Sequence, residues 1–203
     1  MNVAIIDYGM GNIKSVVSAL KYIGVTNITL SNQYDVLDTA DKLILPGVGS
    51  FKQAMETIKR IGLDQSLHEL VINRQKPILG ICLGMQLMTR SSTEEAFTAG
   101  LGFIDAEVTR FEQHSVRIPH VGFNQVRVNP ALNLYHEMEG EIDFYFTHSY
   151  KALSAQQINQ CMCDYDGEFI ASYEQNNIAG VQFHPELSQN NGLKLLQNFI
   201  ERF

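Results

Sequence analysis

Four short apolar runs separated by helical segments occupy the first half of the chain and most constrain its fold. The runs are residues 3–7, 28–30, 43–45 and 78–81, and they consist mainly of Ile, Leu and Val. After the first run, Val16, Leu20 and Ile23 recur at helical spacing before Gly24. Short, fully apolar strands that alternate with helices predict a mostly parallel sheet with helices on both faces.

The second half has a different pattern. Strand-like runs at residues 106–110, 125–128, 143–147, 169–173 and 179–183 follow one another closely, which predicts additional antiparallel strands. An apolar stripe over residues 192–203 predicts a final helix. We find no repeat or linker, and therefore expect one α/β domain over residues 1–203.

Composition excludes several classes of protein. A net charge of −7 and a pI near 5.3 argue against non-specific nucleic-acid binding, which needs a basic surface. The beginning of the sequence lacks a basic segment and a long apolar run, so we expect neither a signal peptide nor a membrane span. The cysteine usage fits a reducing cytoplasm.

No metal or cofactor is expected. Cys161 and Cys163 fall on one face of a predicted strand, where packing is the simpler interpretation because no C-x-x-C or histidine cluster accompanies them. The sequence has no G-x-x-x-x-G-K-[ST] loop, and the glycines at positions 9 and 11 lack the third glycine of a dinucleotide fingerprint.

Cys82 stands between a predicted strand and a predicted helix, with Gly80 and Gly84 two residues to either side. This G-x-C-x-G pattern is the cysteine form of a nucleophile elbow. The tight turn would place the thiol at the carboxyl edge of the sheet, where the following helix favours a thiolate. The N–H of Leu83 would point to a developing oxyanion.

A thiolate nucleophile needs a base, and His184 is the best candidate among six histidines. It follows the apolar run at 179–183, and Pro185 and Glu186 come directly after it. Pro185 stiffens the backbone and Glu186 can orient the imidazole, which predicts a Cys–His–Glu triad. His68, His114 and His136 have polar neighbours and are expected at the surface.

Three segments together resemble the class I (triad) glutamine amidotransferases: residues 45–51 (Leu-Pro-Gly-Val-Gly-Ser-Phe), 80–86 (Gly-Ile-Cys-Leu-Gly-Met-Gln) and 180–186 (Gly-Val-Gln-Phe-His-Pro-Glu). The segments 7–12 (Asp-Tyr-Gly-Met-Gly-Asn) and 46–51 are similar to the glutaminase subunits of imidazole glycerol phosphate synthases, which act in histidine biosynthesis. The resemblance extends over residues 5–186 and implies a flavodoxin-like fold.

The resemblance also implies roles for individual residues. Cys82 would attack the side-chain amide of L-glutamine and form a thioester, while His184, oriented by Glu186, would transfer the protons. The N–H groups of Leu83 and, after a peptide flip, Val48 would form the oxyanion hole. The matched substrate-binding positions are Gly49, Gln86, Glu94, Ser149 and Tyr150. His148 would line the pocket or serve as plain packing.

The implied partner is a (βα)8-barrel cyclase subunit. In such a heterodimer it would use the ammonia to make imidazole glycerol phosphate and an aminoimidazole carboxamide ribotide (AICAR). Asn12, His120, Phe123 and Leu187 are expected at the interface. Two of these positions depart from the family, which usually has Trp in place of Phe123 and Lys in place of Leu187.

These departures leave alternatives open. A paralogous glutaminase subunit could supply ammonia to a different synthase, such as one that amidates a sugar-nucleotide or glycan precursor. The glutaminase of pyridoxal phosphate synthesis shares His-Pro-Glu-Leu but has a different elbow and oxyanion loop. A peptidase or γ-glutamyl hydrolase, and an inactive scaffold that only regulates a partner, are the remaining interpretations.

Overall fold

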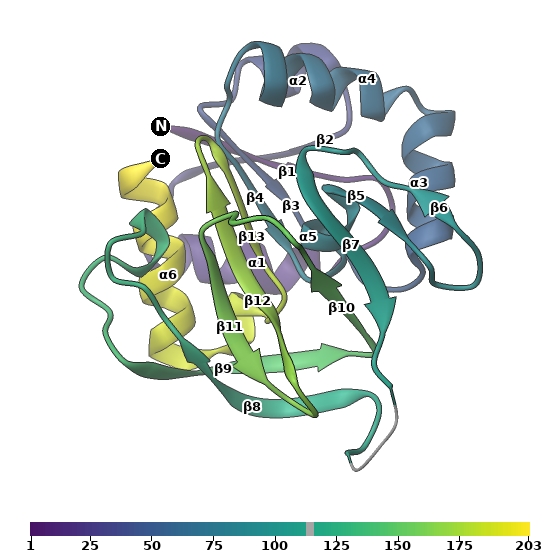
Figure 1. Cartoon of the computed structure of the whole chain (residues 1–203). Helices are drawn as coiled ribbons and strands as arrows, with labels where there is room; N and C mark the ends of the chain where they lie inside the picture. The colour runs from purple at the N-terminus through teal and green to yellow at the C-terminus, as the bar shows by residue number, and fades with distance from the viewer. Residues whose placement is uncertain (113–115) are drawn as a thin grey trace.

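The computed structural model describes residues 1–112 and 116–203, so that His114, expected at the surface, lies outside the described residues. Within this part of the chain, thirteen strands form one sheet (Figure 1). The strands are β1 (Asn2–Ile6), β2 (Asn27–Ser31), β3 (Lys42–Leu45), β4 (Ile78–Ile81), β5 (Thr89–Ser92), β6 (Thr98–Ala99), β7 (Ile104–Arg110), β8 (His120–Arg127), β9 (Glu141–His148), β10 (Tyr150–Leu153), β11 (Gln160–Asp164), β12 (Glu168–Gln175) and β13 (Ile178–Val181). The helices are α1 (Ile13–Tyr22), α2 (Tyr34–Asp38), α3 (Phe51–Arg60), α4 (Leu63–Leu67), α5 (Leu83–Leu87) and α6 (Gln189–Arg202), with a π-helical segment η1 (His68–Asn73) and the 3-10 turns η2 (Asn133–Tyr135) and η3 (Pro185–Leu187).

The centre of the sheet is parallel. Its strands lie in the order β2-β1-β3-β4-β13, and each pair of neighbours is parallel. The strands of the second half add mainly antiparallel pairs, from β12 through β10 to β7, together with the β8–β9 hairpin. The predicted α/β class, with a parallel centre and antiparallel additions, is confirmed.

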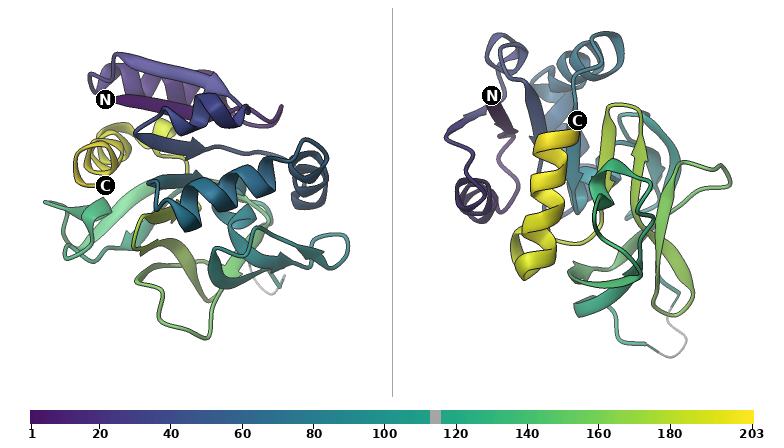
Figure 2. Two further views of the ribbon diagram at one scale, coloured as in Figure 1. Left: turned by 90° about the horizontal axis from the view of Figure 1, so that it is seen from above. Right: turned by 90° about the vertical axis from the view of Figure 1, so that its left-hand side faces the viewer.

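Each face of the sheet packs against a separate apolar core. Val3 and Ile5 point to one face, where α1 and α6 pack, whereas Ala4 and Ile6 point to the other, where α3, α4 and α5 pack. This alternation follows from the period of two in a strand. Figure 2 shows α6 between the amino-terminal strands and the β8–β9 region, and α6 contacts both α1 and β9.

Several elements were not expected from the sequence. Helix α2 and strands β5, β6 and β10 are additional, and β8 begins at His120 rather than near residue 125. The first half of β8 contains Gly122 and Asn124, which have low strand propensity, so this segment carries little local signal. It is a strand because residues 120–127 pair in continuous register with β9.

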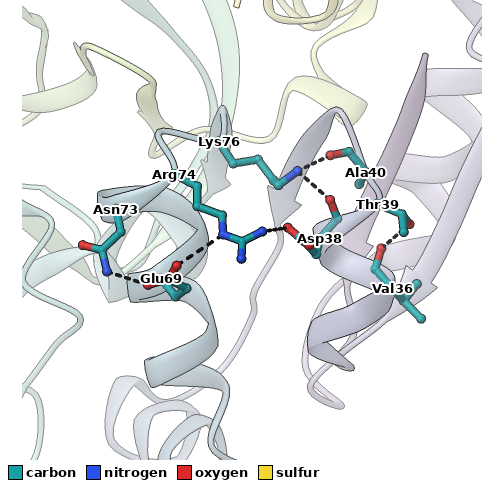
Figure 3. A network of polar contacts seen from close by, with 8 residues as sticks. All are labelled: Val36, Asp38, Thr39, Ala40, Glu69, Asn73, Arg74 and Lys76. Carbon is teal, nitrogen blue, oxygen red and sulfur yellow. Dashed lines mark hydrogen bonds and ion pairs between the residues drawn. The ribbon is translucent and has the colours of Figure 1, made fainter.

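Polar contacts connect the loops at the amino ends of β3 and β4 (Figure 3). Arg74 binds Asp38 at 2.6 Å and Glu69 at 3.2 Å, and Lys76 donates to the carbonyl groups of Asp38 and Ala40. Surface ion pairs of this kind contribute little to stability individually, but the Lys76 ammonium also provides hydrogen-bond donors to two loop carbonyls. The network fixes the edge of the sheet opposite to the carboxyl ends of the strands.

Among the described residues, no helix has both the length and the apolar character that crossing a membrane requires.

Candidate active site

Three chain segments meet at the carboxyl edge of the parallel strands. Strands β4 and β13 are parallel neighbours, with Ile81 opposite Val181. Strand β3 pairs with β4 on its other side, and the loop at residues 46–50 follows it. Residues that follow adjacent parallel strands emerge at the same edge, where open α/β sheets bind ligands. The register therefore brings Cys82 and His184 to one place.

The backbone at Cys82 is strained, as expected for an elbow. Cys82 has φ 53° and ψ −110°, in a region that non-glycine residues rarely adopt. The flanking glycines are required by close contacts, because a Cβ at Gly84 would lie 1.8 Å from the carbonyl oxygen of Leu45 and one at Gly80 would lie 2.7 Å from the Met85 nitrogen. Leu83 is the first residue of α5, so its N–H has no acceptor within the helix and is available to a ligand.

His184 and Glu186 form a buried pair. His184 Nδ1 donates to Glu186 Oε1 at 2.8 Å, and the two side chains are 4% and 1% exposed. The carboxylate can only accept, so it fixes the proton on Nδ1 and directs Nε2 to another partner. Nε2 is buried, and no group in the described part of the chain makes a well-aligned hydrogen bond with it.

The charge of His184 follows from its two acidic neighbours. Burial lowers the pKa of His184, but Cys82 and Glu186 together outweigh burial and raise this pKa to about 10. The imidazolium is therefore the favoured form beside the sulfur of Cys82. Long or poorly aligned contacts between a nucleophile and its base are common before substrate binds, so the attraction of Cys82 does not require an aligned bond at rest.

A pocket of about 270 Å³ opens over Cys82. It brings together Cys82, His184, the two oxyanion-hole candidates and all five predicted substrate-binding residues. The lining residues are Val48, Gly49, Cys82, Leu83, Gln86, Glu94, Thr147, His148, Ser149, Tyr150 and His184. Glu186 lies behind His184 and outside this lining, as an orienting residue should.

Glu94 supplies a carboxylate to the pocket. Its Oε2 accepts from the Phe51 N–H at 2.9 Å at the start of α3, which fixes the side chain. Burial, partly offset by this hydrogen bond and increased by Glu95, raises the pKa of Glu94. A half-buried carboxylate of this kind favours a cationic group such as the α-ammonium of an amino acid.

The loop that carries Val48 is held by a residue that the sequence analysis did not assign. Tyr8 is buried, and its hydroxyl donates to the Pro46 carbonyl at 3.0 Å. Gly47 packs against it, since a Cβ there would lie 2.5 Å from the Tyr8 oxygen. Burial and the proximity of Cys82 raise the pKa of Tyr8, so it remains a neutral donor. Its position just beyond the carboxyl end of β1, which ends at Ile6, is the signal that could have identified it.

A second unassigned residue, Gln182, lies beside the nucleophile. It is fully buried, and its Nε2 contacts Cys82 Sγ at 3.7 Å. The sequence placed Gln182 inside the Gly-Val-Gln-Phe-His-Pro-Glu segment but gave it no role. The signal is positional, because residues directly after the paired Ile81 and Val181 must be neighbours.

Three of the four predicted interface residues are exposed. Phe123 and Leu187 are 49% and 41% exposed, and Asn12 lies at the surface at the start of α1. His120 requires a correction: it is only 3% exposed, because its ring stacks on Phe146 and Tyr165. Its side chain therefore belongs to a buried cluster and is not presented to a partner in this conformation.

Cys161 and Cys163 are both buried in β11, as the packing interpretation predicted. Burial raises the pKa of Cys163 to about 12, which keeps this thiol neutral and unreactive. Over residues 1–112 and 116–203, no cluster of three or more His, Cys, Asp or Glu side chains could hold a metal ion.

Comparison with known proteins identifies the class. Residues 4–203 match the family model for glutamine amidotransferase class-I. A solved structure described as a glutamine amidotransferase superposes with a TM-score of 0.78, with 18% identity over 99% of this chain and 98% of that one, which supports the fold. The chain belongs to the class-I glutamine amidotransferase family.

Named relatives cover nearly the whole chain. "Imidazole glycerol phosphate synthase subunit HisH 1" of Campylobacter jejuni (strain RM1221) is 45% identical, over 98% of each chain. "Imidazole glycerol phosphate synthase subunit HisH 2" of Vibrio vulnificus (strain YJ016) is 41% identical, over 99% of this chain and 94% of the relative.

Proposed function

We propose that this chain, as one domain over residues 1–203, is the glutaminase subunit of an imidazole glycerol phosphate synthase. It hydrolyses L-glutamine to glutamate and ammonia, and a (βα)8 cyclase subunit uses the ammonia to make imidazole glycerol phosphate and AICAR in histidine biosynthesis. The observation that carries the proposal is the single pocket shared by Cys82, His184 and Glu94. The names of the full-length relatives support the pathway.

In the first half-reaction the Cys82 thiolate attacks the side-chain amide carbon of glutamine. The N–H of Leu83 and, once its peptide has rotated, that of Val48 stabilise the negative charge that develops on the amide oxygen. The C–N bond breaks as the His184 imidazolium gives its Nε2 proton to the departing nitrogen, which leaves as ammonia. Glu94 holds the substrate ammonium during this step.

In the second half-reaction a water molecule attacks the glutamyl thioester. Neutral His184 accepts a proton from the water, the C–S bond breaks, and glutamate leaves while the Cys82 thiolate is regenerated beside the imidazolium. Glu186 keeps the proton on Nδ1 throughout, so Nε2 can both give and accept.

A partner follows from the chemistry of the product. Ammonia in neutral water is mostly ammonium, which is not a nucleophile, so it must reach its acceptor by a shielded path. Asn12, Phe123 and Leu187 form the proposed contact surface for the cyclase in a heterodimer, with the complex in the cytoplasm. Opening the loop at Val48 only when the cyclase is loaded would prevent wasteful hydrolysis, because one oxyanion donor is worth about 10²–10³ in rate.

The proposal is tested by glutamate release from the purified chain, alone and with the cognate cyclase and its nucleotide ligand. Strong stimulation by the loaded cyclase is expected. Full glutaminase activity in the isolated chain would contradict the gating, and absence of stimulation by the cyclase would contradict the pathway.

A paralogous glutaminase that serves a sugar-nucleotide or glycan synthase is the second candidate, favoured by Phe123 and Leu187 in place of Trp and Lys. Restoring these residues with Phe123→Trp and Leu187→Lys separates the two candidates. If the chain serves the cyclase, the double variant binds it at least as tightly as the native chain. Cyclase binding that appears only in the double variant would favour a different synthase.

A further inference from the structure

A chain of buried hydrogen bonds ends on the nucleophile. Gln182 Nε2 donates to Cys82 Sγ at 3.7 Å, and its Oε1 accepts from Gln86 Nε2 at 2.8 Å. The same Gln86 nitrogen donates to the Tyr150 carbonyl at 3.2 Å. Both hydrogens of the Gln86 amide are thus used, and its oxygen is left for a ligand in the pocket that it lines.

This arrangement fixes which end of Gln182 meets the sulfur. The Tyr150 carbonyl can only accept, so Gln86 must present its nitrogen there. That nitrogen must then face the oxygen of Gln182, because two amide NH₂ groups cannot hydrogen-bond to each other. The nitrogen of Gln182 is consequently directed at Cys82 and cannot exchange places with the oxygen.

Two histidines extend the chain on the far side of Tyr150. His148 Nδ1 lies 2.7 Å from the Tyr150 carbonyl and must donate to it. Neutral His148 therefore accepts at Nε2 from His120 Nδ1, 3.0 Å away, and His120 accepts at Nε2 from Asn124 at 3.3 Å. The Tyr150 carbonyl, which can only accept, therefore determines the position of every proton in this series of hydrogen bonds.

The two histidines meet because of strand register and stay neutral because of their surroundings. His120 and His148 are directly opposite in the β8–β9 pair. The rings of Phe111, Phe146 and Phe169 enclose them. Burial lowers the pKa of His120 to about 4 and that of His148 to about 3. Both imidazoles are therefore neutral at neutral pH, and the donor and acceptor roles along the hydrogen bonds are kept.

We propose that Gln182 is a further catalytic residue that donates a hydrogen bond to the Cys82 thiolate, and that His148 and His120 are positioning residues that anchor the Tyr150 carbonyl, on which the donating orientation of the Gln182 amide depends. An N–H donor interacts more strongly with a thiolate than with a thiol, so it increases the fraction of sulfur that is ready to attack. The inference rests on the proposed function, because it assigns a role within the glutaminase reaction.

The test compares Gln182→Met, which preserves the size of the side chain but removes the donor, with Gln182→Glu, which replaces the donor by an acceptor. Alkylation of Cys82 by iodoacetamide is followed by mass spectrometry of the Cys82 peptide, near neutral pH and again at high pH. The free energy of a hydrogen bond to a charged group corresponds to a factor of about ten or more in an equilibrium constant, here that between thiol and thiolate. Q182M should therefore alkylate about tenfold more slowly near neutral pH, Q182E more slowly still, and both should approach the native rate at high pH.

The positioning role is tested with His148→Leu and His148→Asn. Asparagine can place an N–H near the position of Nδ1, so H148N should restore much of the alkylation rate that H148L loses. Asn198→Leu is the matched control, because it removes a buried amide from α6, where it donates to Leu134 and His136, and should leave Cys82 reactivity unchanged.

Two results would overturn the assignment. The first is an alkylation rate in folded Q182M that equals the native rate near neutral pH. The second is an equal decrease in alkylation rate at both pH values, which would indicate a general distortion of the site. The alkylation assay needs neither glutamine nor a partner. If the chain proves not to be a glutaminase although the predicted order of alkylation rates holds, the proposed function fails while the contact of Gln182 with the thiolate stands.

Discussion

Two buried histidines line the same pocket and have opposite protonation behaviour. His184 and His148 are 3% and 7% exposed, so burial acts on both in the same direction. Yet the pKa of His184 is raised to about 10, whereas the pKa of His148 is lowered to about 3. His184 binds a carboxylate and is influenced by the sulfur of Cys82, whereas His148 contacts a backbone carbonyl and another imidazole.

The comparison shows that the neighbouring groups determine the charge of a buried imidazole. An acidic neighbour makes the charged form favourable even without solvent, and a neutral acceptor does not compensate for desolvation. Within one pocket the fold therefore provides one histidine that favours the charged form and one that stays neutral within a series of hydrogen bonds.

The largest effect is expected from Cys82→Ala, which removes the proposed nucleophile and one of the two groups that raise the pKa of His184. Glutamate release should fall by about 10⁴-fold or more. Synthesis by the partner from added ammonium salts should be unchanged, because the acceptor site is not altered. Cys163→Ala, a buried cysteine outside the pocket, is the matched control and should keep full activity. Glutamine-dependent synthesis in the Cys82 variant would exclude the triad.

Glu186→Gln should make His184 resemble His148, since it replaces a carboxylate with a neutral group. The pKa of His184 should fall, and kcat/KM for glutamine should decrease by about 10³-fold, because the proton is no longer held on Nδ1. Steady-state glutamate release with the partner present measures this loss. Glu137→Gln is the control, because Glu137 also lies beside a histidine, His136, but at the surface. A loss below about tenfold in the Glu186 variant would contradict an orienting role.

The neutral pair should make the protein sensitive to acid. His120 and His148 have pKa values of about 4 and about 3 in the folded chain, below the value of ~6.5 expected when unfolded. Their stabilising contribution is complete above pH ~6.5 and is lost as pH falls toward these folded values, by about 1.4 kcal/mol per pH unit for each histidine. His184 has the opposite sign, because its contribution is complete below pH ~6.5 and is lost as pH rises through about 10.

Urea unfolding between pH ~7.5 and ~5.5 measures the acid effect. In the native chain the unfolding free energy should decrease as the pH is lowered. In the double variant His120→Asn, His148→Asn this pH dependence should be much weaker, whereas His136→Asn, at the surface, should keep it. An equal pH dependence in the native chain and the double variant would show that the buried pair does not resist protonation.

The smallest effect concerns Tyr8, which resembles His148 in donating to a backbone carbonyl. Tyr8→Phe leaves the Pro46 carbonyl without its donor and should lower the unfolding free energy by about 1–2 kcal/mol. Glutaminase activity in the complex should decrease by less than about tenfold, because the loop that carries Val48 is held less firmly. Tyr22→Phe, on the exposed side of α1, should change neither quantity.

The sequence was most informative where structure and chemistry are local. The apolar runs and their helical spacers predicted the parallel centre, and the glycines around Cys82 predicted the elbow. The residues that form β8 were harder to assign, because Gly122 and Asn124 are weak strand formers and only pairing with β9 makes them a strand. His120 was expected at the partner interface for the same reason, since its burial depends on rings from β9 and from the β11–β12 turn.

By itself the sequence predicted Cys82 as the nucleophile, and it determined the elbow at Cys82 and the His184–Glu186 pair, whose members are only two residues apart. The tertiary structure alone decided which groups tune them. Tyr8 meets Pro46 across 38 residues, His120 meets His148 across 28, and Gln182 meets Cys82 across 100. A short segment fixes its own geometry through local sterics, whereas contacts between distant strands depend on register, and a shift of one residue would turn every side chain to the other face of the sheet.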